Sequence, residues 1–110
     1  MTHYVCMVQE GQTAAASVEP LTRGLERVAE EMFGDDPAEL EIRWVTIPAG
    51  YGFTAGKPST SSLVVRSVPP GLDQDRRVAF MKSVCDLWQD VTGCSLNEIV
   101  VTAYDGPLPI

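Results

Sequence analysis

The two halves of the chain repeat one pattern of apolar and glycine positions. An apolar run that ends at Val8 is followed by Gly11, and a second run that ends at Val68 is followed by Gly71, so both pairs lie 60 residues apart. Self-similarity at a fixed offset indicates that one supersecondary unit occurs twice. At 110 residues the chain is long enough for one domain with a single hydrophobic core, which the two units must share.

Each apolar run is followed by a segment with the period of an amphipathic helix. Its apolar residues recur at steps of three and four, the spacing of one helix face. Gly34 and Gly93 come after these segments, and glycine commonly ends a helix in the left-handed conformation. The predicted buried stripes are Val18, Leu21, Leu25, Val28 and Met32 in the first segment and Val78, Met81, Cys85, Trp88 and Thr92 in the second.

A further strand is predicted after each of these glycines, over residues 40–45 and 98–104. Each half therefore reads β-α-β, a unit with two parallel strands and a right-handed crossover. We expect the first unit at about 1–47, a Gly-, Pro- and Ser-rich loop connector at about 48–61, the second unit at about 62–104 and a C-terminal tail at 105–110. The predicted fold class is α/β (α+β), with a four-stranded mixed sheet and both helices on one face.

The predicted strands are apolar at consecutive positions, over residues 4–8, 63–65 and 99–101. Such strands are typical of a sheet that is buried on both faces, but two helices can cover only one of them. We therefore expect other copies of the chain to cover the second face, which predicts a homo-oligomer.

Charge and composition argue against several classes of function. The formal net charge is −7, whereas nucleic-acid binding needs clustered Lys and Arg. No apolar run approaches the roughly 20 residues that span a bilayer, and no secretory signal is recognisable, so we expect a cytoplasmic protein with no membrane partner. One histidine and three dispersed cysteines form no metal-binding motif, so we expect no metal and no cofactor. An anionic ligand would need a nearby arginine to offset the negative charge.

The ordered set of motifs resembles the tautomerase superfamily over nearly the whole chain. The turn at residues 9–12 is similar to the Glu-Gly-Arg turn of the 4-oxalocrotonate tautomerases. Residues 42–45, followed by 50–56, resemble that family's Val-Arg-Val strand and Gly-x-Phe-Gly hairpin. The segment at 47–50 and the single fused chain resemble the cis-3-chloroacrylic acid dehalogenase branch. The resemblance implies a tautomerase/MIF-like fold and, because fused members assemble as trimers, a homotrimer.

The resemblance also implies a site. In that superfamily a terminal proline acts as general base or acid, and here Thr2 stands at its position, with a free amine if Met1 is removed. Arg43 matches the arginine that binds the substrate, and Phe53 matches the apolar wall. Arg66 and Tyr104 are further substrate-binding candidates. The implied reaction is a cofactor-free proton transfer, tautomerase-, isomerase- or dehalogenase-like, on a small 2-oxo or unsaturated carboxylic acid.

The sequence also departs from that pattern. Thr2 replaces the proline, Gln12 stands where tautomerases carry the turn arginine, and Ala29 stands where dehalogenases carry a helix histidine. The alternative is therefore an inactive member that binds a small molecule or a partner. A ferredoxin-like regulatory module is a third possibility, since β-α-β-β-α-β is also the element order of that fold.

Structural roles stay open for the single residues. Arg43 and Arg66 could form salt bridges within the chain or between subunits instead of binding a ligand. Phe53 and Tyr104 could simply pack in the core.

Overall fold

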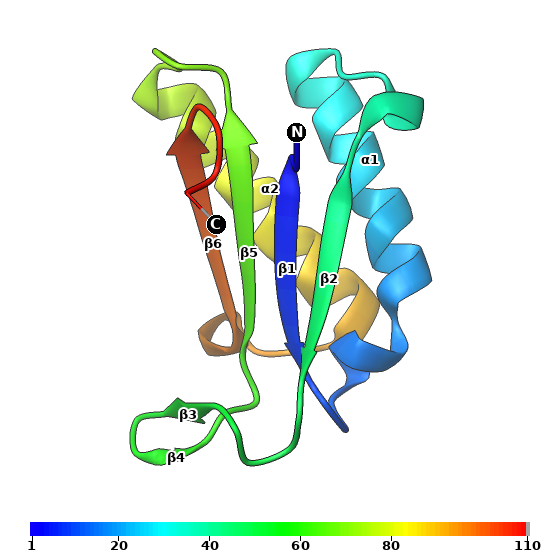
Figure 1. Ribbon diagram of the computed structural model, residues 1–110, viewed down its shortest axis with the longest axis vertical. Coiled ribbons are helices and arrows are strands. Elements are labelled where there is room, and N and C mark those ends of the chain that lie inside the picture. Colours follow the sequence, from blue (N-terminus) through cyan, green and yellow to red (C-terminus); the bar gives the residue numbers. More distant parts are fainter. Residues whose placement is uncertain (110) are drawn as a thin grey trace.

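The computed structural model describes residues 1–109 and shows two β-α-β units in succession (Figure 1). The first unit consists of β1 (Tyr4–Gln9), α1 (Val18–Phe33) and β2 (Ile42–Ile47). The second consists of β5 (Ser62–Val68), α2 (Gln74–Thr92) and β6 (Ile99–Asp105). Short 3-10 turns, η1 (Thr13–Ala16), η2 (Pro37–Glu39) and η3 (Leu96–Glu98), lie between these elements. The predicted C-terminal tail, 105–110, is described as far as residue 109, and its last residue lies outside the described part.

The four long strands form one mixed sheet in the order β2-β1-β5-β6. The strands of each unit are adjacent and parallel, whereas β1 and β5 pair antiparallel at the centre, with Val5 opposite Val65. This order confirms the predicted fold class. It differs from a ferredoxin-like module, in which the strands of each β-α-β unit are split by another strand, so that alternative is wrong for this chain.

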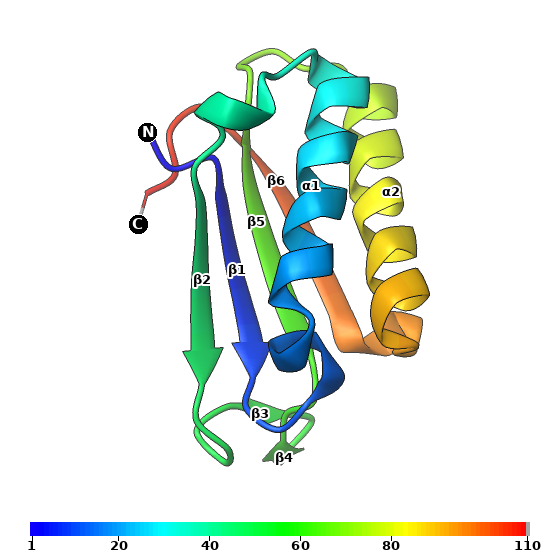
Figure 2. The ribbon, with the colours of Figure 1, turned by 90° about the vertical axis from the view of Figure 1, so that its right-hand side faces the viewer.

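Both helices pack on the same face of the sheet (Figure 2). The core lies between the two layers and includes Tyr4, Cys6 and Val8 of β1, which alternate with residues of the opposite face. The two helices approach each other closely at Gly24, where the lack of a side chain leaves room for Leu87. A Cβ atom at Gly24 would lie 2.3 Å from Leu87 Cδ1. The helix-ending glycines have the left-handed backbone that the repeat predicts, with φ of 68° at Gly34 and 70° at Gly93.

Trp88 is buried as predicted, but the rest of the stripe predicted for the second helix is not its buried face. Val78 is 48% exposed, and Met81 and Cys85 are only partly buried. The buried side chains of α2 are Phe80, Val84, Leu87 and Trp88. The sequence around 74–92 carries two apolar stripes with helical spacing, and the offset of 60 selects the wrong one. The offset that relates the helix-ending glycines, 34 and 93, is 59, and it pairs the buried residues of α2 with those of α1.

The connector between the units is not entirely loop. It contains a small hairpin of β3 (Phe53–Thr54) and β4 (Lys57–Pro58), turned by Ala55 and Gly56, both with positive φ. The hairpin lies at the opposite end of the sheet from the chain start (Figure 1). No helix within residues 1–109 is long and apolar enough to cross a bilayer.

The sheet face opposite the helices, here called the open face, carries side chains in rows across the four strands. The register of the strands places these rows side by side. One row is apolar and consists of Val45, Met7, Leu63 and Val100. The next consists of Arg43, Val5, Val65 and Thr102, and a third, nearest the chain start, contains His3, Ser67 and Tyr104.

Candidate functional site

A cavity of about 280 Å³, here called the terminal cavity, lies where the chain begins. It is bordered by the chain start, the segment after α1, the end of β5 and the loop after β6; its lining includes Met1, His3, Asp35, Arg66, Ser67 and Pro107. The loop after β6 is fixed here by two hydrogen bonds. Ser67 Oγ donates to the Gly106 carbonyl at 2.6 Å, and the Gly106 N–H donates to the Val68 carbonyl at 2.9 Å. The chain start and the loop after β6 therefore lie at one end of the sheet (Figures 1 and 2).

Arg66 forms the charged floor of the terminal cavity. It points toward the helices and is only 2% exposed. Nη2 donates to Asp35 Oδ2 at 2.5 Å, and Nε donates to the Ser67 carbonyl at 2.7 Å. The guanidinium also lies 4.7 Å from the centre of the Tyr4 ring and 5.1 Å from that of Phe33, within cation–π range. Within residues 1–109, Nη1 has no hydrogen-bond partner. The salt-bridge role is thus seen directly, and any ligand role is additional.

The groups under Arg66 are held uncharged. Burial raises the pKa of Tyr4 to about 12, although the adjacent Arg66 opposes this shift. The Tyr4 hydroxyl donates to the Leu25 carbonyl at 3.1 Å. Burial likewise raises the pKa of the Cys6 thiol to about 12. Neither side chain is therefore suited to act as a base or nucleophile near neutral pH.

The chain start reaches the terminal cavity through Met1. Its ammonium lies 3.4 Å from Glu41 Oε2 in an exposed ion pair. Such a pair is weak in water, so the amine can leave Glu41 at little cost. Thr2 is the next residue and is half-buried, but it does not line the cavity while Met1 is present. Removal of Met1 would move the terminal amine to Thr2.

His3 is a cavity residue that the reasoning from sequence missed. Its Nδ1 accepts a hydrogen bond from the Glu41 N–H at 3.1 Å, which fixes the ring beside the chain start. The signal that could have found it is its position next to Thr2, combined with its being the one histidine of the chain. That histidine was weighed only as a metal ligand.

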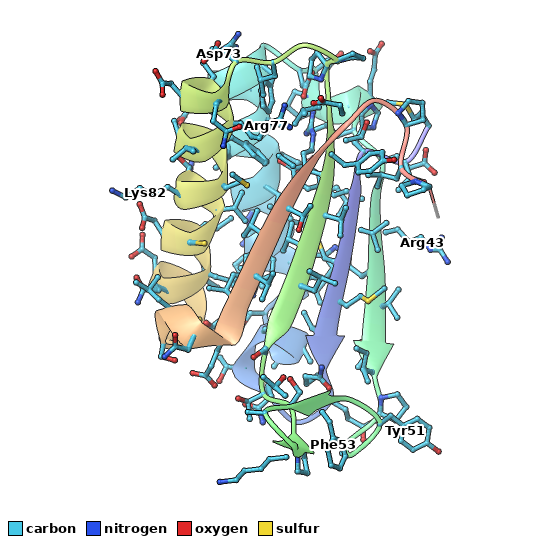
Figure 3. All side chains as sticks on the ribbon, turned by 90° about the vertical axis from the view of Figure 1, so that its left-hand side faces the viewer. Arg43, Tyr51, Phe53, Asp73, Arg77 and Lys82 are labelled. Atoms are coloured by element: carbon cyan, nitrogen blue, oxygen red, sulfur yellow. The ribbon has the colours of Figure 1, made fainter. Side chains whose placement is uncertain are left out.

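Arg43 lies on the open face of the edge strand β2 and does not line the terminal cavity. Figure 3 shows it pointing away from the helices, on the side of the sheet where the chain ends lie. Within residues 1–109 it forms no ion pair, since Glu41 contacts the Met1 amine and Glu98 accepts from the Ser95 N–H. The intrachain salt bridge that is the alternative role of Arg43 is therefore not formed by the described residues.

Phe53 and Tyr104 do not pack in the core, where the alternative placed them. Phe53 is 65% exposed and borders a different cavity, of about 310 Å³, at the hairpin end of the sheet (Figure 3). Tyr104 is 42% exposed and pairs in register with Ser67, so it flanks the terminal cavity on the open face. The structure thus gathers the chain start, Arg66 and Tyr104 at one end and leaves Phe53 at the other.

A third cavity, here called the twin cavity, has a volume of about 200 Å³ and lies at the hairpin end, on the helix side. It is bordered by the same kinds of segment as the terminal cavity. Thr60 precedes β5 and Ser62 begins it, Cys94 follows α2, and Thr13 follows β1. The duplication therefore gives the molecule two related cavities at opposite ends, only one of which contains a chain start.

Metal-binding side chains do not gather in the part of the chain that the structure describes. Within residues 1–109 no group of three or more His, Cys, Asp or Glu residues could hold a metal ion. The polar side groups of the terminal cavity are the Met1 amine, the His3 imidazole, the Arg66 guanidinium with its partner carboxylate of Asp35, and the Ser67 hydroxyl. The N–H and O–H donors among them can bind anions and oxo groups through hydrogen bonds.

No protein-family model and no curated protein matches the sequence. Solved structures do match the fold. The structure of native Ps01740 is 23% identical, covers 94% of this chain and 93% of its own, and superposes with a TM-score of 0.85. Pt0534, inactivated by 2-oxo-3-pentynoate, is 22% identical over 94% of this chain and 85% of its own, with a TM-score of 0.79.

A member of the cis-3-chloroacrylic acid dehalogenase family is also similar. It is 12% identical and covers 94% of this chain and 74% of its own, with a TM-score of 0.83. Fused 4-OT proteins that form symmetric or asymmetric trimers match at 18% identity and a TM-score of 0.80. The chain thus has the fold of these tautomerase-superfamily structures, and the resemblance drawn from its sequence is confirmed for the fold.

Proposed function

We propose that the protein catalyses a cofactor-free proton transfer on a small 2-oxo or unsaturated carboxylic acid, with the terminal cavity as its site. The observation that carries this proposal is the meeting of a chain start and a buried arginine in one cavity at the end of the sheet. Such a cavity offers a base beside a fixed guanidinium, which is paired with Asp35. Enolisation of an oxo acid needs a base and a group that stabilises the developing charge. Inactivation of Pt0534, which has the same fold, by 2-oxo-3-pentynoate supports this substrate class.

Each residue has a separate role in this proposal. The unprotonated terminal amine, on Thr2 if Met1 is removed and on Met1 otherwise, takes the proton from C3 of the substrate and returns it. Arg43 binds the substrate carboxylate, because it is exposed on the open face and forms no ion pair within residues 1–109. Arg66, paired with Asp35, forms the floor beneath the substrate. Tyr104 flanks the substrate, and Phe53 shields a site only if it reaches one on a neighbouring copy.

The proposal includes a homotrimer. The apolar row on the open face, Val45, Met7, Leu63 and Val100, is incompletely covered within residues 1–109: the first three side chains are half-buried, and Val100 is 51% exposed. Association of three copies over this face would bury that row, and fused 4-OT proteins of the same fold form trimers. It would also bring Arg43 and Phe53 of neighbouring copies near a cavity. Light scattering on the purified protein tests this: a monomer at micromolar concentration would contradict the trimer.

Labelling with 2-oxo-3-pentynoate tests the site directly. We expect the terminal nitrogen to add to the alkyne, so that the protein gains the full mass of the reagent and a peptide map places it on the first residue. Arg43→Ala should slow labelling at least tenfold, and the matched control Arg27→Ala, an exposed arginine on α1, should not. Labelling only at Cys85 or Cys94, or equal rates for both arginine variants, would refute the proposed site.

Turnover is measured as the conversion of phenylenolpyruvate to its keto form. The expected result is a rate above that of buffer, reduced in Arg43→Ala and unchanged in Arg27→Ala. An inactive protein that still binds oxo acids would instead support the second function, that of a ligand-binding member. The observation that favours this second function is the absence of a proline at position 2.

A further inference from the structure

We propose that His3 is a catalytic residue of the terminal cavity, whose Nε2–H donates a hydrogen bond to the C2 oxygen of a bound 2-oxo acid. The inference rests on the proposed function of that cavity. It adds a donor that stabilises the charge that develops on the substrate oxygen.

The tautomer of His3 follows from its hydrogen bond. Nδ1 accepts from the Glu41 N–H at 3.1 Å, and a backbone N–H can only donate. In a neutral imidazole one nitrogen carries the proton while the other accepts, so the proton is on Nε2. Within residues 1–109 this Nε2–H has no hydrogen-bond partner, which leaves it free for a ligand.

His3 is also held rigidly, as a catalytic donor must be. Its backbone extends β1 between two neighbours: its N–H donates to the Glu41 carbonyl at 2.9 Å, and its carbonyl accepts from the Ser67 N–H at 2.8 Å. Backbone and ring are thus fixed by three hydrogen bonds to adjacent strands, so little ordering is required when a ligand binds. A prearranged donor of this kind stabilises developing charge better than a mobile one.

The surrounding charges suit a neutral donor. His3 shares the cavity with Met1, Asp35 and Arg66, and Glu41 pairs with the Met1 ammonium. On the open face, Tyr104 lies in the same row as His3, and Arg43 lies in the next row. Asp35 and Arg66 neutralise each other. The free cation among them is Arg43, which can hold a carboxylate while the imidazole contacts the adjacent oxo group.

His3 keeps its Nε2 proton throughout the proposed reaction. When the terminal amine removes the C3 proton, the electron pair of the C–H bond forms the C2–C3 double bond and the negative charge moves to the C2 oxygen. The His3 Nε2–H strengthens its hydrogen bond to that oxygen but keeps its proton. The amine then delivers the proton to the C2 oxygen, which gives the enol. Ketonisation of phenylenolpyruvate follows the same steps in reverse: the amine takes the proton of the C2 hydroxyl and delivers it to C3. A neutral imidazole is known to polarise a carbonyl in this way.

The first test is NMR of the protein's single histidine, whose signals need no assignment. A long-range ¹H–¹⁵N spectrum at mildly alkaline pH should show the Nε2–H tautomer, and saturating pyruvate should shift its Nε2 and Hε1 signals. The Nδ1–H tautomer, or signals that do not move with saturating pyruvate, would overturn the inference. This readout does not depend on turnover.

The second test is kinetic and uses His3→Asn. The asparagine Oδ1 can still accept from the Glu41 N–H, but the variant lacks the donor at the Nε2 position. We expect kcat for phenylenolpyruvate to fall roughly a hundredfold, the loss typical of a single oxyanion donor, with KM changed less than threefold. Melting curves of both proteins show whether the variant folds. A kcat within threefold of wild type would overturn the role of His3 and leave the proposed function standing. A wild-type protein without turnover would remove the proposed function and leave the NMR result to judge His3 as a ligand donor.

Discussion

Removing the carboxylate of Asp35 should destabilise the protein far more than removing an exposed ion-pair partner. The Arg66 side chain is 3% exposed, and Asp35 is the acid that neutralises it. In Asp35→Ala the guanidinium keeps the Ser67 carbonyl and the Tyr4 and Phe33 rings but loses its counter-charge. Breaking a buried pair costs about 3–5 kcal/mol. Because the Asp35 side chain is 29% exposed and water can partly replace it, we expect the low end, about 3 kcal/mol.

The matched control is Arg23→Ala on the same helix. It removes the Arg23–Glu19 pair, whose side chains are 64% and 84% exposed, and should cost about 0.5 kcal/mol or less. Urea denaturation at one fixed protein concentration gives both values, since oligomer stability depends on concentration. In a thermal melt the Asp35 variant should lose roughly 12 °C, at about 4 °C per kcal/mol.

A double variant distinguishes the cost of leaving a buried charge uncompensated from the cost of losing the Asp35–Arg66 contact. Asp35→Ala with Arg66→Met leaves no buried charge, so most of the lost stability should return. The reasoning is refuted if Asp35→Ala costs no more than Arg23→Ala, or if the double variant is less stable than Asp35→Ala alone.

Three further outcomes follow from the packing. Gly24→Ala should lower the free energy of unfolding by about 1–3 kcal/mol despite the better helix propensity of alanine, because the new Cβ would lie 2.3 Å from Leu87 Cδ1. Adding Leu87→Ala should lessen the effect of the Gly24 change. A gain in stability from Gly24→Ala alone would contradict the close contact. Burial raises the pKa of Tyr4 from 10.0 to about 12, so the unfolded chain releases the phenol proton at lower pH than the folded chain. Ionisation of Tyr4 should therefore leave stability unchanged below pH 10 and lower it between pH 10 and 12, by up to about 1.4 kcal/mol per pH unit. Tyr4→Phe should flatten this slope, and an unchanged slope would contradict the raised pKa. Arg77→Lys should accelerate amide hydrogen exchange at the end of β6, because the guanidinium donates to both the Ala103 carbonyl at 2.8 Å and Asp105 Oδ1 at 2.7 Å. Protection equal to that of wild type would show that these contacts do not hold the strand.

The fold could be predicted because the repeat, the helix-ending glycines and the strand patterns all indicate the same unit. The detail of α2 could not, since two apolar stripes compete over residues 74–92 and only packing against Leu25 and its neighbours on α1 selects Phe80, Val84 and Leu87. The hairpin of β3 and β4 was also missed as a pair of strands, because two-residue strands have no periodicity to detect.

The candidate site was predictable only in part. Arg43 alternates with Ile42 and Trp44 along the strand, which indicates that its side chain points to the opposite face from theirs, and the structure places it there. Arg66 alternates in the same way but faces the helices, because a salt bridge and aromatic rings offset the cost of burying it. His3 gave no signal alone. The orientation of its ring depends on a hydrogen bond from the Glu41 N–H, and no local sequence pattern reveals a contact between residues 38 positions apart.

The twin cavity shows what fusion of two units does to a terminus. At the hairpin end an unbroken backbone runs through residues 59–62, where the related position at the other end has a free chain start. A protein expressed as two fragments, divided in the connector and reassembled through the β1–β5 seam, would acquire a second amino terminus beside Thr60 and Ser62. Under the proposed function, the single chain therefore has one reactive end per molecule, because a continuous backbone occupies the related position at the hairpin end.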